Sequence, residues 1–299
     1  MALEALAAVQ DGVVTGQQLH DHGVTVSRLR TQLRLGRWVR IRRNAYLLDL
    51  VRNVQDPWVQ ARAVSLTMPG VVVSGASAAR LWGIEGATAE TVEVTVPRRR
   101  ALRARPDLAP RRREIGDGDV TLLRGIPVTT ALRTVRDLVL DGDRLSALAV
   151  CDSALHKRLL LPGDLLTARA QADGLPGSAG VADIWALADG RAESVLESRV
   201  RLRCIDGLVP PDDLQVVIRA SDGRFVARAD LAWSRRSRGR TGLLVVEADG
   251  RVVHGTVEAA YHDRSRQNDV VGTGHDMLRV TWRDTTDALT IPRAVRTVL

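Results

Sequence analysis

The chain lacks two features that would place it outside the cytoplasm or in a membrane. It has only two cysteines, Cys151 and Cys204, which match no metal-ligand spacing and are too few for a disulfide framework. No run of 18 or more apolar residues occurs, so the sequence predicts no membrane-spanning helix and no membrane partner. Residues 1–12, MALEALAAVQDG, have no positively charged segment ahead of an apolar one, so we expect no signal peptide. The expected location is the cytoplasm.

Lysine is almost absent as well. Lys157 is the single lysine, so nearly all positive charge comes from arginine, a bias that a GC-rich genome produces through codon usage. The net charge is +8 and unevenly placed: residues 1–50 carry +3, residues 51–113 carry +6, residues 114–190 carry −4 and residues 191–299 carry +3. This distribution predicts two separate surfaces that face an anion, and nucleic acid is the anion we expect.

Residues 1–50 carry the helix signals of a small DNA-binding domain. Caps and apolar spacing predict helices over 2–10 and 16–22 and a third that starts near Thr25 or Ser27, before two short strands around Arg43–Asn44. Three helices and a basic hairpin indicate a winged helix-turn-helix, with its third helix in the major groove of double-stranded DNA. The expected DNA contacts are Ser27, Arg28, Arg30, Thr31 and Arg34 on the helix and Arg40, Arg42 and Arg43 on the wing. A helical bundle with a solvated basic rim is the alternative.

Residues 51–175 predict a mixed α/β domain with nothing catalytic in it. Helices are expected over 57–67, after a Ser74 cap, over 131–140 after a Thr130 cap, over 145–159 and from Pro162, with strands at TVEVTVP and DVTLLRGIPVTT. The segment 98–113 holds eight arginines and two prolines and predicts an exposed loop, which either grips phosphates or is a solvated insertion. Asp152 and His156, four residues apart, form either a metal pair or, more simply, a surface contact across one helical turn.

The segment Phe225–His254 combines two apolar strands with buried acids. FVARADLAW and LLVVEADGRVVH flank a Gly/Ser/Arg turn, which predicts adjacent antiparallel strands. Asp230 and Glu247 lie inside these strands, where a carboxylate costs several kcal/mol unless it is paired or binds a metal. Asp249 lies two residues past Glu247 and shares its face. Oxygen ligands that face one spot predict a site for Mg²⁺.

The last third of the chain, residues 190–299, reads as one domain. The expected order is a helix over 193–204, strands at LQVVIRA, RFVARADLAW and LLVVEAD, a helix over 257–271, a strand at MLRVTW and a helix over 292–299. This α-β-β-β-α-β order is that of the restriction-endonuclease-like core. The chain is therefore expected to be an α+β multidomain protein with domains at 1–50, 51–175 and 190–299.

The run GVVTGQQLHDHGVTVSRLRTQLRLGRWVRIRRNAYLL resembles the N-terminal domain of AbiEi-type antitoxins, which are winged-helix proteins of type IV toxin–antitoxin systems. SGASAARLWGI and GIPVTTALRTVRDL are similar to the segment that follows that domain in actinobacterial relatives. The resemblance implies binding to promoter DNA and repression of the protein's own operon. It also implies a cognate toxin of the nucleotidyltransferase type as a partner.

SVLESRVRLR, ARADLAW, VVEADGRVVH and LRVTW together resemble the very-short-patch-repair endonucleases (Vsr-like) of the PD-(D/E)XK superfamily. The resemblance makes Glu197 the helix acid, Asp230 the metal-holding acid, Glu247 the acid of the E-x-K element and His254 the histidine after the third strand. Asp230 and Glu247 would bind Mg²⁺ or Mn²⁺, and Glu197 would orient water or hold a second ion. His254 would move a proton, and Arg266 would stabilise charge on the phosphorane.

One position departs from that superfamily. Its Lys, two residues after Glu247, is Asp249 here, and an acid cannot supply positive charge but could bind metal. Two functions stay open: a DNA-binding, metal-dependent endonuclease, or a non-enzymatic type IV antitoxin and autorepressor. In the second case the fold is an inactive nuclease whose acids are satisfied by Arg228, Arg251 or Arg266. A third possibility is a protein-interaction module that neutralises a toxin through residues 114–190.

Overall fold

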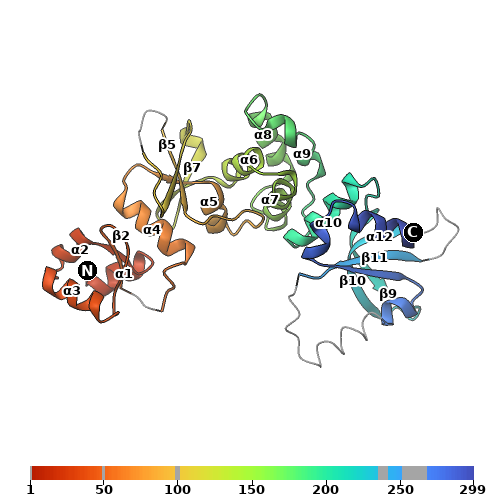
Figure 1. The fold of residues 1–299 in the computed structure, drawn as a ribbon, viewed down its shortest axis with the longest axis horizontal. Helices are drawn as coiled ribbons and strands as arrows, with labels where there is room; N and C mark the ends of the chain where they lie inside the picture. The colour runs from red at the N-terminus through yellow and green to blue at the C-terminus, as the bar shows by residue number, and fades with distance from the viewer. Residues whose placement is uncertain (1, 49–50, 98–101, 235–241, 251–267) are drawn as a thin grey trace. The chain divides into compact units, whose positions relative to one another are not determined.

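The computed structural model describes residues 2–48, 51–97, 102–234, 242–250 and 268–299. Within these ranges the chain is an α+β protein with three separate β-sheets, which confirms the expected α+β class. It divides into two compact units, residues 1–138 and 139–299, each described by itself below (Figure 1). The expected domain boundary near residue 175 falls inside the second unit. No helix in the described ranges is long and apolar enough to cross a membrane.

The first unit begins with three short helices and a small sheet. The elements are α1 (Leu3–Val9), β1 (Val13–Thr15), α2 (Gly16–Asp21), α3 (Val26–Arg34), β2 (Val39–Arg42) and β3 (Ala45–Leu47). Thr15 caps α2 in a capping box with Gln18, and Thr25 caps α3, as expected from the sequence. Asn44 takes the left-handed conformation in the β2–β3 turn, with φ of +64°. Strand β1 was not expected, and it pairs with β3 to give the order β1-β3-β2.

Helix α4 (Pro57–Thr67) packs against this small sheet. Val59 and Ala63 of α4 form one buried cluster with Val13, Ala45 and Leu47. A buried ion pair adds to this contact: both Nε and Nη2 of Arg62 donate to Asp11 Oδ2 at 3.0 Å, and Arg62 Nη2 also donates to the Arg124 carbonyl. Because both charges are buried, loss of either partner would leave an uncompensated charge in this contact.

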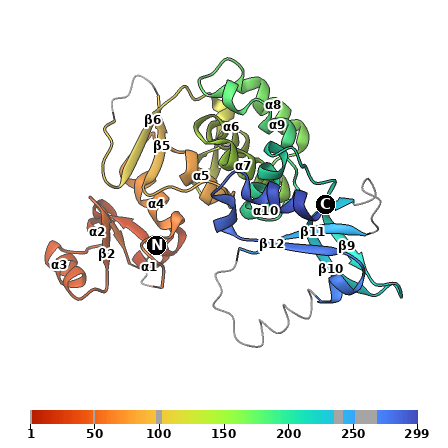
Figure 2. The same cartoon turned by 45° about the vertical axis from the view of Figure 1, so that its right-hand side comes forward.

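A five-stranded sheet completes the first unit (Figure 2). Its order is β6-β5-β4-β8-β7, and its elements with their helices are β4 (Val72–Val73), α5 (Gly75–Trp82), β5 (Val92–Val96), β6 (Leu108–Arg112), β7 (Val120–Leu123) and β8 (Ile126–Thr129). The expected loop at 98–113 is wrong over 108–112, because β6 pairs in parallel with β5 and Leu108 is fully buried. Residues 98–101 lie outside the described ranges.

The start of α5 is capped differently from the expectation. Ser74 precedes the helix but makes no capping hydrogen bond through its side chain; its hydroxyl accepts from Thr95 Oγ1 at 2.8 Å. Instead Glu93 on β5 accepts from the Ala76 backbone N–H at 2.7 Å, and Arg111 on β6 donates to Glu93 at 2.9 Å. A carboxylate at a helix N-terminus is favourable for the helix dipole, so Glu93 takes the place of the serine cap.

Helix α6 (Ala131–Asp141), capped by Thr130, contains the boundary between the units, and four further helices open the second unit. They are α7 (Arg144–His156), α8 (Pro162–Ala172), α9 (Ile184–Leu187) and α10 (Val195–Asp206). The expectation for Asp152 is wrong: it is 1% exposed and pairs with Arg201 of α10, whose Nη2 lies 2.7 and 2.9 Å from its two oxygens. His156 is exposed and contacts the Gly190 carbonyl through Nδ1 at 3.1 Å, so the two do not form a metal pair.

A four-stranded sheet with the order β12-β11-β10-β9 forms the rest of the second unit (Figure 1). Its elements are β9 (Asp213–Arg219), β10 (Phe225–Ser234), β11 (Leu243–Ala248) and β12 (Asp276–Val280), followed by α12 (Thr290–Val298). The first three strands form the expected antiparallel meander, and β12 runs parallel to β11. One face packs on α10 and α12 through Leu231, Val246 and Val200. Residues 268–272 are helical, and the rest of the helix expected over 257–271 lies outside the described residues.

Candidate functional site

The acid expected on the helix, Glu197, lies in the first turn of α10 and is 8% exposed. Ser194 Oγ accepts from the Glu197 N–H at 3.2 Å, and Glu197 Oε2 accepts from the Glu193 N–H at 2.9 Å. This is the S-x-x-E pattern of a helix start, with the glutamate reaching one residue further back than usual. The carboxylate is therefore held at the N-terminal end of α10, where the helix dipole favours a negative charge.

A glutamine that the sequence did not single out connects Glu197 to the sheet. Gln215 on β9 donates from Nε2 to Glu197 Oε2 at 2.8 Å. The β9–β10 register pairs Leu214 with Leu231 and Val216 with Ala229, which sets Gln215 opposite Asp230. Burial raises the pKa of Glu197, and the Asp230 and Glu193 carboxylates raise it further, against the backbone and Ser194 hydrogen bonds. Glu197 and Asp230 are therefore neighbours at one place in the second unit.

Asp230 is fixed from the other side by β11. Its Oδ2 accepts from the Ala248 N–H at 2.8 Å, and the pairing of Leu231 with Val246 sets Asp230 beside Glu247. Glu247 in turn lies opposite Arg279 of β12, with Oε2 and Nη2 3.5 Å apart. Arg279 is a partner that the sequence did not indicate, because the parallel pairing of β11 with β12 is a long-range contact.

The other arginines expected near these acids have different surroundings or cannot be placed. Arg228 Nη2 donates to Glu193 Oε2 at 2.6 Å. Arg251 and Arg266 lie outside the described residues, as does His254. Asp249 follows the last residue of β11, and its N–H donates to the Val280 carbonyl at 2.8 Å. The roles given to His254, Arg266 and Asp249 stay predictions.

The described residues include no group of three or more His, Cys, Asp or Glu side chains that could hold a metal ion. Glu197, Asp230 and Glu247 are all described, so these three carboxylates alone do not form a three-ligand centre. One observation nevertheless fits an oxygen-liganded cation: Gln215 Oε1 is buried and has no hydrogen-bond partner within the described part of the chain. Carboxylate and amide oxygens are the ligands that Mg²⁺ and Mn²⁺ accept, so the donor chemistry of this place suits such an ion.

Most of the residues expected to contact DNA are accessible. On α3, Ser27, Arg28, Arg30 and Arg34 are exposed and Thr31 is half-buried; on the hairpin, Arg40 and Arg43 are exposed. Arg42 is a correction: it is buried, its Nη2 lies 3.3 Å from Asp107 Oδ2 and 3.2 Å from Met68 Sδ. Burial lowers the pKa of Arg42, an effect that Asp107 opposes. These contacts join the hairpin to the residues just before β6, so Arg42 is less accessible than the other arginines expected to contact DNA.

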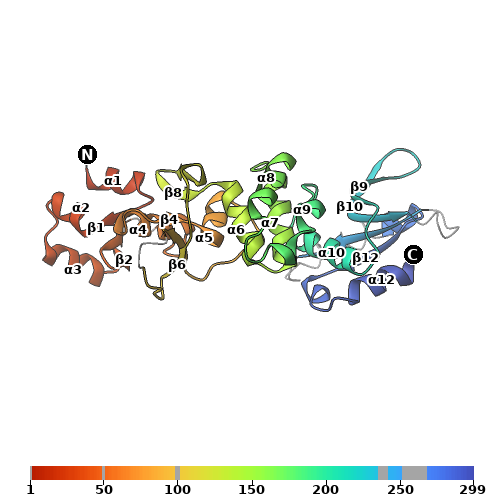
Figure 3. The same ribbon diagram turned by 90° about the horizontal axis from the view of Figure 1, so that it is seen from above.

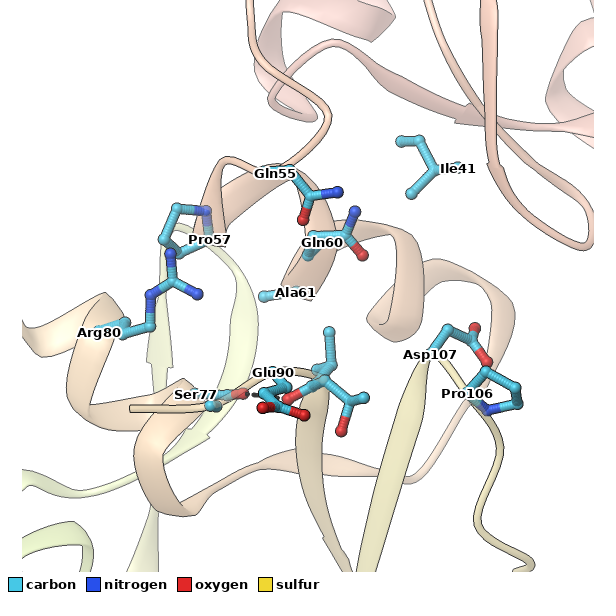
Figure 4. A pocket seen from close by; sticks show the side chains of 13 residues that line it. Ile41, Gln55, Pro57, Gln60, Ala61, Ser77, Arg80, Glu90, Pro106 and Asp107 are labelled. Carbon is cyan, nitrogen blue, oxygen red and sulfur yellow. Dashed lines mark hydrogen bonds between the residues drawn. The ribbon is translucent and has the colours of Figure 1, made fainter. Parts of the chain in front are cut away.

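A pocket of about 250 Å³ lies between Ile41 of β2, helices α4 and α5, and the residues just before β6 (Figure 4). Two of its polar side chains, Ser77 and Gln60, are engaged within the chain. Ser77 Oγ accepts from the Glu93 N–H and contacts the Thr91 carbonyl, and Gln60 Nε2 donates to the Val54 carbonyl. The volume falls below the roughly 300–1,000 Å³ typical of small-molecule sites. We assign no ligand to it.

No protein-family model matches the chain. It is similar to two curated proteins of Mycobacterium tuberculosis, "Uncharacterized protein MT2308" of strain CDC 1551 / Oshkosh and "Uncharacterized protein Rv2248" of strain ATCC 25618 / H37Rv. Each is 36% identical over 107 residues, which cover 36% of this chain and 38% of the relative's length. The crystal structure of the RV2827C protein from Mycobacterium tuberculosis aligns over 62% of this chain and 80% of that one, with a TM-score of 0.39 and 18% identity. A likeness at this level carries no argument about fold or function.

Proposed function

We propose that the protein binds double-stranded DNA and carries a metal-dependent endonuclease site in its second unit. The observation that carries the proposal is that Gln215 on β9 donates to Glu197 and lies opposite Asp230, which β11 orients, so two acids from different elements are brought to one residue. In this proposal the first 50 residues are a winged helix-turn-helix of the AbiEi antitoxin type. Residues 190–299 are a Vsr-like member of the PD-(D/E)XK superfamily.

Three arginines support the DNA-binding part. Arg28, Arg30 and Arg34 are exposed on α3, whose N-terminus is capped by Thr25. The order of three helices and the sheet β1-β3-β2 is compatible with a winged helix-turn-helix, in which the third helix enters the major groove. Arg40 and Arg43 on the β2–β3 hairpin would contact the phosphate backbone.

The second unit supplies fixed carboxylates for phosphodiester hydrolysis. A bound Mg²⁺ or Mn²⁺ would polarise the scissile phosphate and lower the pKa of bound water. Asp230 is oriented by the Ala248 N–H, and Glu197 by the Gln215 amide and the Glu193 N–H, so neither carboxylate has to be ordered when substrate binds.

The salt dependence of duplex affinity tests the DNA-binding part. We expect Arg30→Ala and Arg34→Ala each to weaken binding and to lower the slope of log K against log salt by about 1, since one phosphate contact is lost. Arg169→Ala, which removes an exposed arginine of α8, is the matched control and should leave the slope unchanged. Equal slopes for all four proteins would contradict the assignment of α3.

Nicking of supercoiled plasmid tests the hydrolytic part. The full-length protein should nick DNA with Mg²⁺ or Mn²⁺ and not with EDTA, and Asp230→Asn and Glu197→Gln should each lower the rate by about 100-fold or more. Asp173→Asn, at an exposed carboxylate after α8, should behave as wild type. If the wild type cleaves neither DNA nor RNA with either metal, the hydrolytic part is wrong.

One observation favours a second candidate, a non-enzymatic type IV antitoxin and autorepressor. Glu247 faces Arg279, as it would where an arginine satisfies an acid of an inactive nuclease fold, and Asp249 stands where the superfamily has Lys. This candidate predicts tight binding to an operator of the protein's own operon and a neighbouring nucleotidyltransferase toxin as partner. Two assays together distinguish the candidates. For an autorepressor, a promoter-reporter assay would show repression that survives Asp230→Asn, and the nicking assay would show no metal-dependent cleavage by wild type.

A further inference from the structure

Gln215 combines two unfavourable features at one residue. Its φ is +55°, which places a non-glycine residue in the left-handed region in the middle of β9. Such a backbone is energetically unfavourable and persists only where the surrounding structure imposes it. It also changes which face of the sheet the strand presents: Leu214 packs in the cluster with α10, whereas Val216 packs on the cluster of the opposite face. Residues two apart normally share a face, so the strand is kinked at Gln215.

The hydrogen bond to Glu197 fixes the orientation of the Gln215 amide. An ionised carboxylate can only accept hydrogen bonds, so the amide NH₂ must face Glu197 and the carbonyl oxygen must point elsewhere. That oxygen, Oε1, is buried and has no partner among the described residues. A buried acceptor without a partner is unfavourable, because it has lost its hydrogen bonds to water, so the fold places a second unfavourable feature next to the first.

The charge around Gln215 indicates what would satisfy this oxygen. Oε1 and Nε2 are bonded to the same carbon and lie roughly 2.3 Å apart, so Oε1 is close to the Glu197 carboxylate that Nε2 contacts. Asp230 lies opposite Gln215 on β10. Two carboxylates beside an amide oxygen make a negative environment, which favours a cation over a neutral donor. Carboxylate and amide oxygens together are ligands for a hard divalent cation.

We propose that Gln215 Oε1 is a ligand of a divalent cation held together with Glu197 and Asp230. Among the described residues, no three His, Cys, Asp or Glu side chains come together as metal ligands. The Gln215 amide oxygen would be the third ligand beside the two carboxylates. It takes the place that sequence reasoning assigned to Glu247, which faces Arg279. The inference rests on the proposed metal-dependent function of this site, but it concerns which residues bind the ion and is tested without turnover.

Mn²⁺ binding to the full-length protein tests the assignment, with free Mn²⁺ measured by electron paramagnetic resonance. Gln215→Gly removes the amide and suits a φ of +55°, so the variant should fold. We expect it to bind Mn²⁺ about tenfold or more weakly, and Asp230→Asn to be affected at least as strongly. Gln215→Glu keeps an oxygen in place and should bind within a few-fold of wild type or more tightly. Gln17→Ala, at an exposed glutamine of α2, is the matched control and should not change binding.

The outcomes separate this inference from the proposed function. Wild-type affinity in Gln215→Gly, with loss in Asp230→Asn, would show that Gln215 is not a ligand, and so would a wild type that binds no Mn²⁺. If Gln215→Gly melts well below wild type, Gln215→Asn replaces it, since Asn tolerates the left-handed backbone and its shorter side chain predicts the same loss. Mn²⁺ binding that depends on Gln215 without any DNA cleavage would support the inference and contradict the endonuclease proposal.

Discussion

His275 couples the start of β11 to the start of β12 through a bond that depends on protonation. Its Nδ1 accepts from the Leu243 N–H at 3.0 Å, so the ring must be neutral with its proton on Nε2. Burial lowers the pKa of His275 below its usual value of 6.5. Protonation of Nδ1 would break this hydrogen bond, which lies in the sheet that carries Asp230 and Glu247.

The pH dependence of stability follows from this shift. Between the folded pKa and 6.5 the unfolded chain takes up a proton that the folded chain does not, so stability is present above 6.5 and is lost as pH falls through this window. We expect His275→Gln, which keeps an acceptor but does not titrate, to lose less stability than wild type between pH 7 and pH 5 in urea unfolding. If the free energy of unfolding falls equally with pH in the two proteins, His275 does not have the lowered pKa.

The two cysteines should be unreactive in the folded protein. Cys151 and Cys204 are fully buried, and burial raises the pKa of Cys204 to about 12 and that of Cys151 further. Because the thiolate is the reactive form, we expect Ellman's reagent to label neither thiol in the native protein and both in denaturant. Rapid labelling of either cysteine under native conditions would contradict the packing of α7 or α10.

At the scale of elements, α7 and α10 are joined by a buried charge pair. Asp152 on α7 also accepts from the Asp189 N–H at 2.8 Å, so its carboxylate has partners besides Arg201. Removing one partner of such a pair leaves a buried charge. We expect Arg201→Met to lower the free energy of unfolding by about 3–5 kcal/mol.

The double variant Asp152→Leu with Arg201→Met checks that reason. It removes both charges and should recover much of the loss, because no unpaired charge remains in the core. Chemical unfolding of the two variants and wild type measures the difference. Similar losses in the single and double variants would mean that packing, and not the unpaired charge, sets the stability of this contact.

Elements whose signals are local could be predicted from the sequence, and those fixed by distant partners could not. The helix over Pro57–Thr67 follows from its apolar periodicity and cap, and strands β10 and β11 of the four-stranded sheet follow from their apolar residues. Strand β6 was missed because LAPRR is basic and contains Pro, and only its pairing with β5 makes it a strand. Arg42 was assigned to DNA because its partners, Met68 and Asp107, are far along the chain.

The candidate site divides in the same way. Asp230 and Glu247 were predicted, because acids inside apolar strands are visible in the sequence. The S-x-x-E pattern from Ser194 to Glu197, which holds Glu197 at the helix start, is also visible in the sequence. The sequence gives no sign that Gln215 belongs to the site. Its left-handed φ and its position opposite Asp230 are set only by the folded sheet.

At the scale of the whole molecule, some arginines of the basic middle segment are engaged in ion pairs within the chain. Two arginines of the basic middle segment pair within the first unit: Arg111 with Glu93 at 2.9 Å, and Arg113 with Asp137 at 3.1 Å. Figure 3 shows β4 and β6 of the five-stranded sheet apart from α3. Arg111 and Arg113 are therefore less available to an anion than the exposed arginines of α3.

This difference gives a prediction about the whole chain. Arg111→Ala should lower the free energy of unfolding by about 1 kcal/mol, since it removes a partly exposed ion pair, and leave the affinity for duplex DNA and its salt dependence unchanged. Arg30→Ala should leave the free energy of unfolding nearly unchanged and weaken the affinity for duplex DNA. Thermal melting and fluorescence anisotropy on the same preparations measure both effects, and a loss of DNA affinity in Arg111→Ala would extend the DNA-binding surface to β6.

The most direct measurement of the cation site is the anomalous difference density of a crystal of the full-length protein soaked in Mn²⁺. We predict one strong peak coordinated by Glu197, Asp230 and Gln215 Oε1, at about 2.0–2.6 Å from the ligand oxygens. A Mn²⁺ peak elsewhere, or no peak at these three side chains under saturating Mn²⁺, would contradict it.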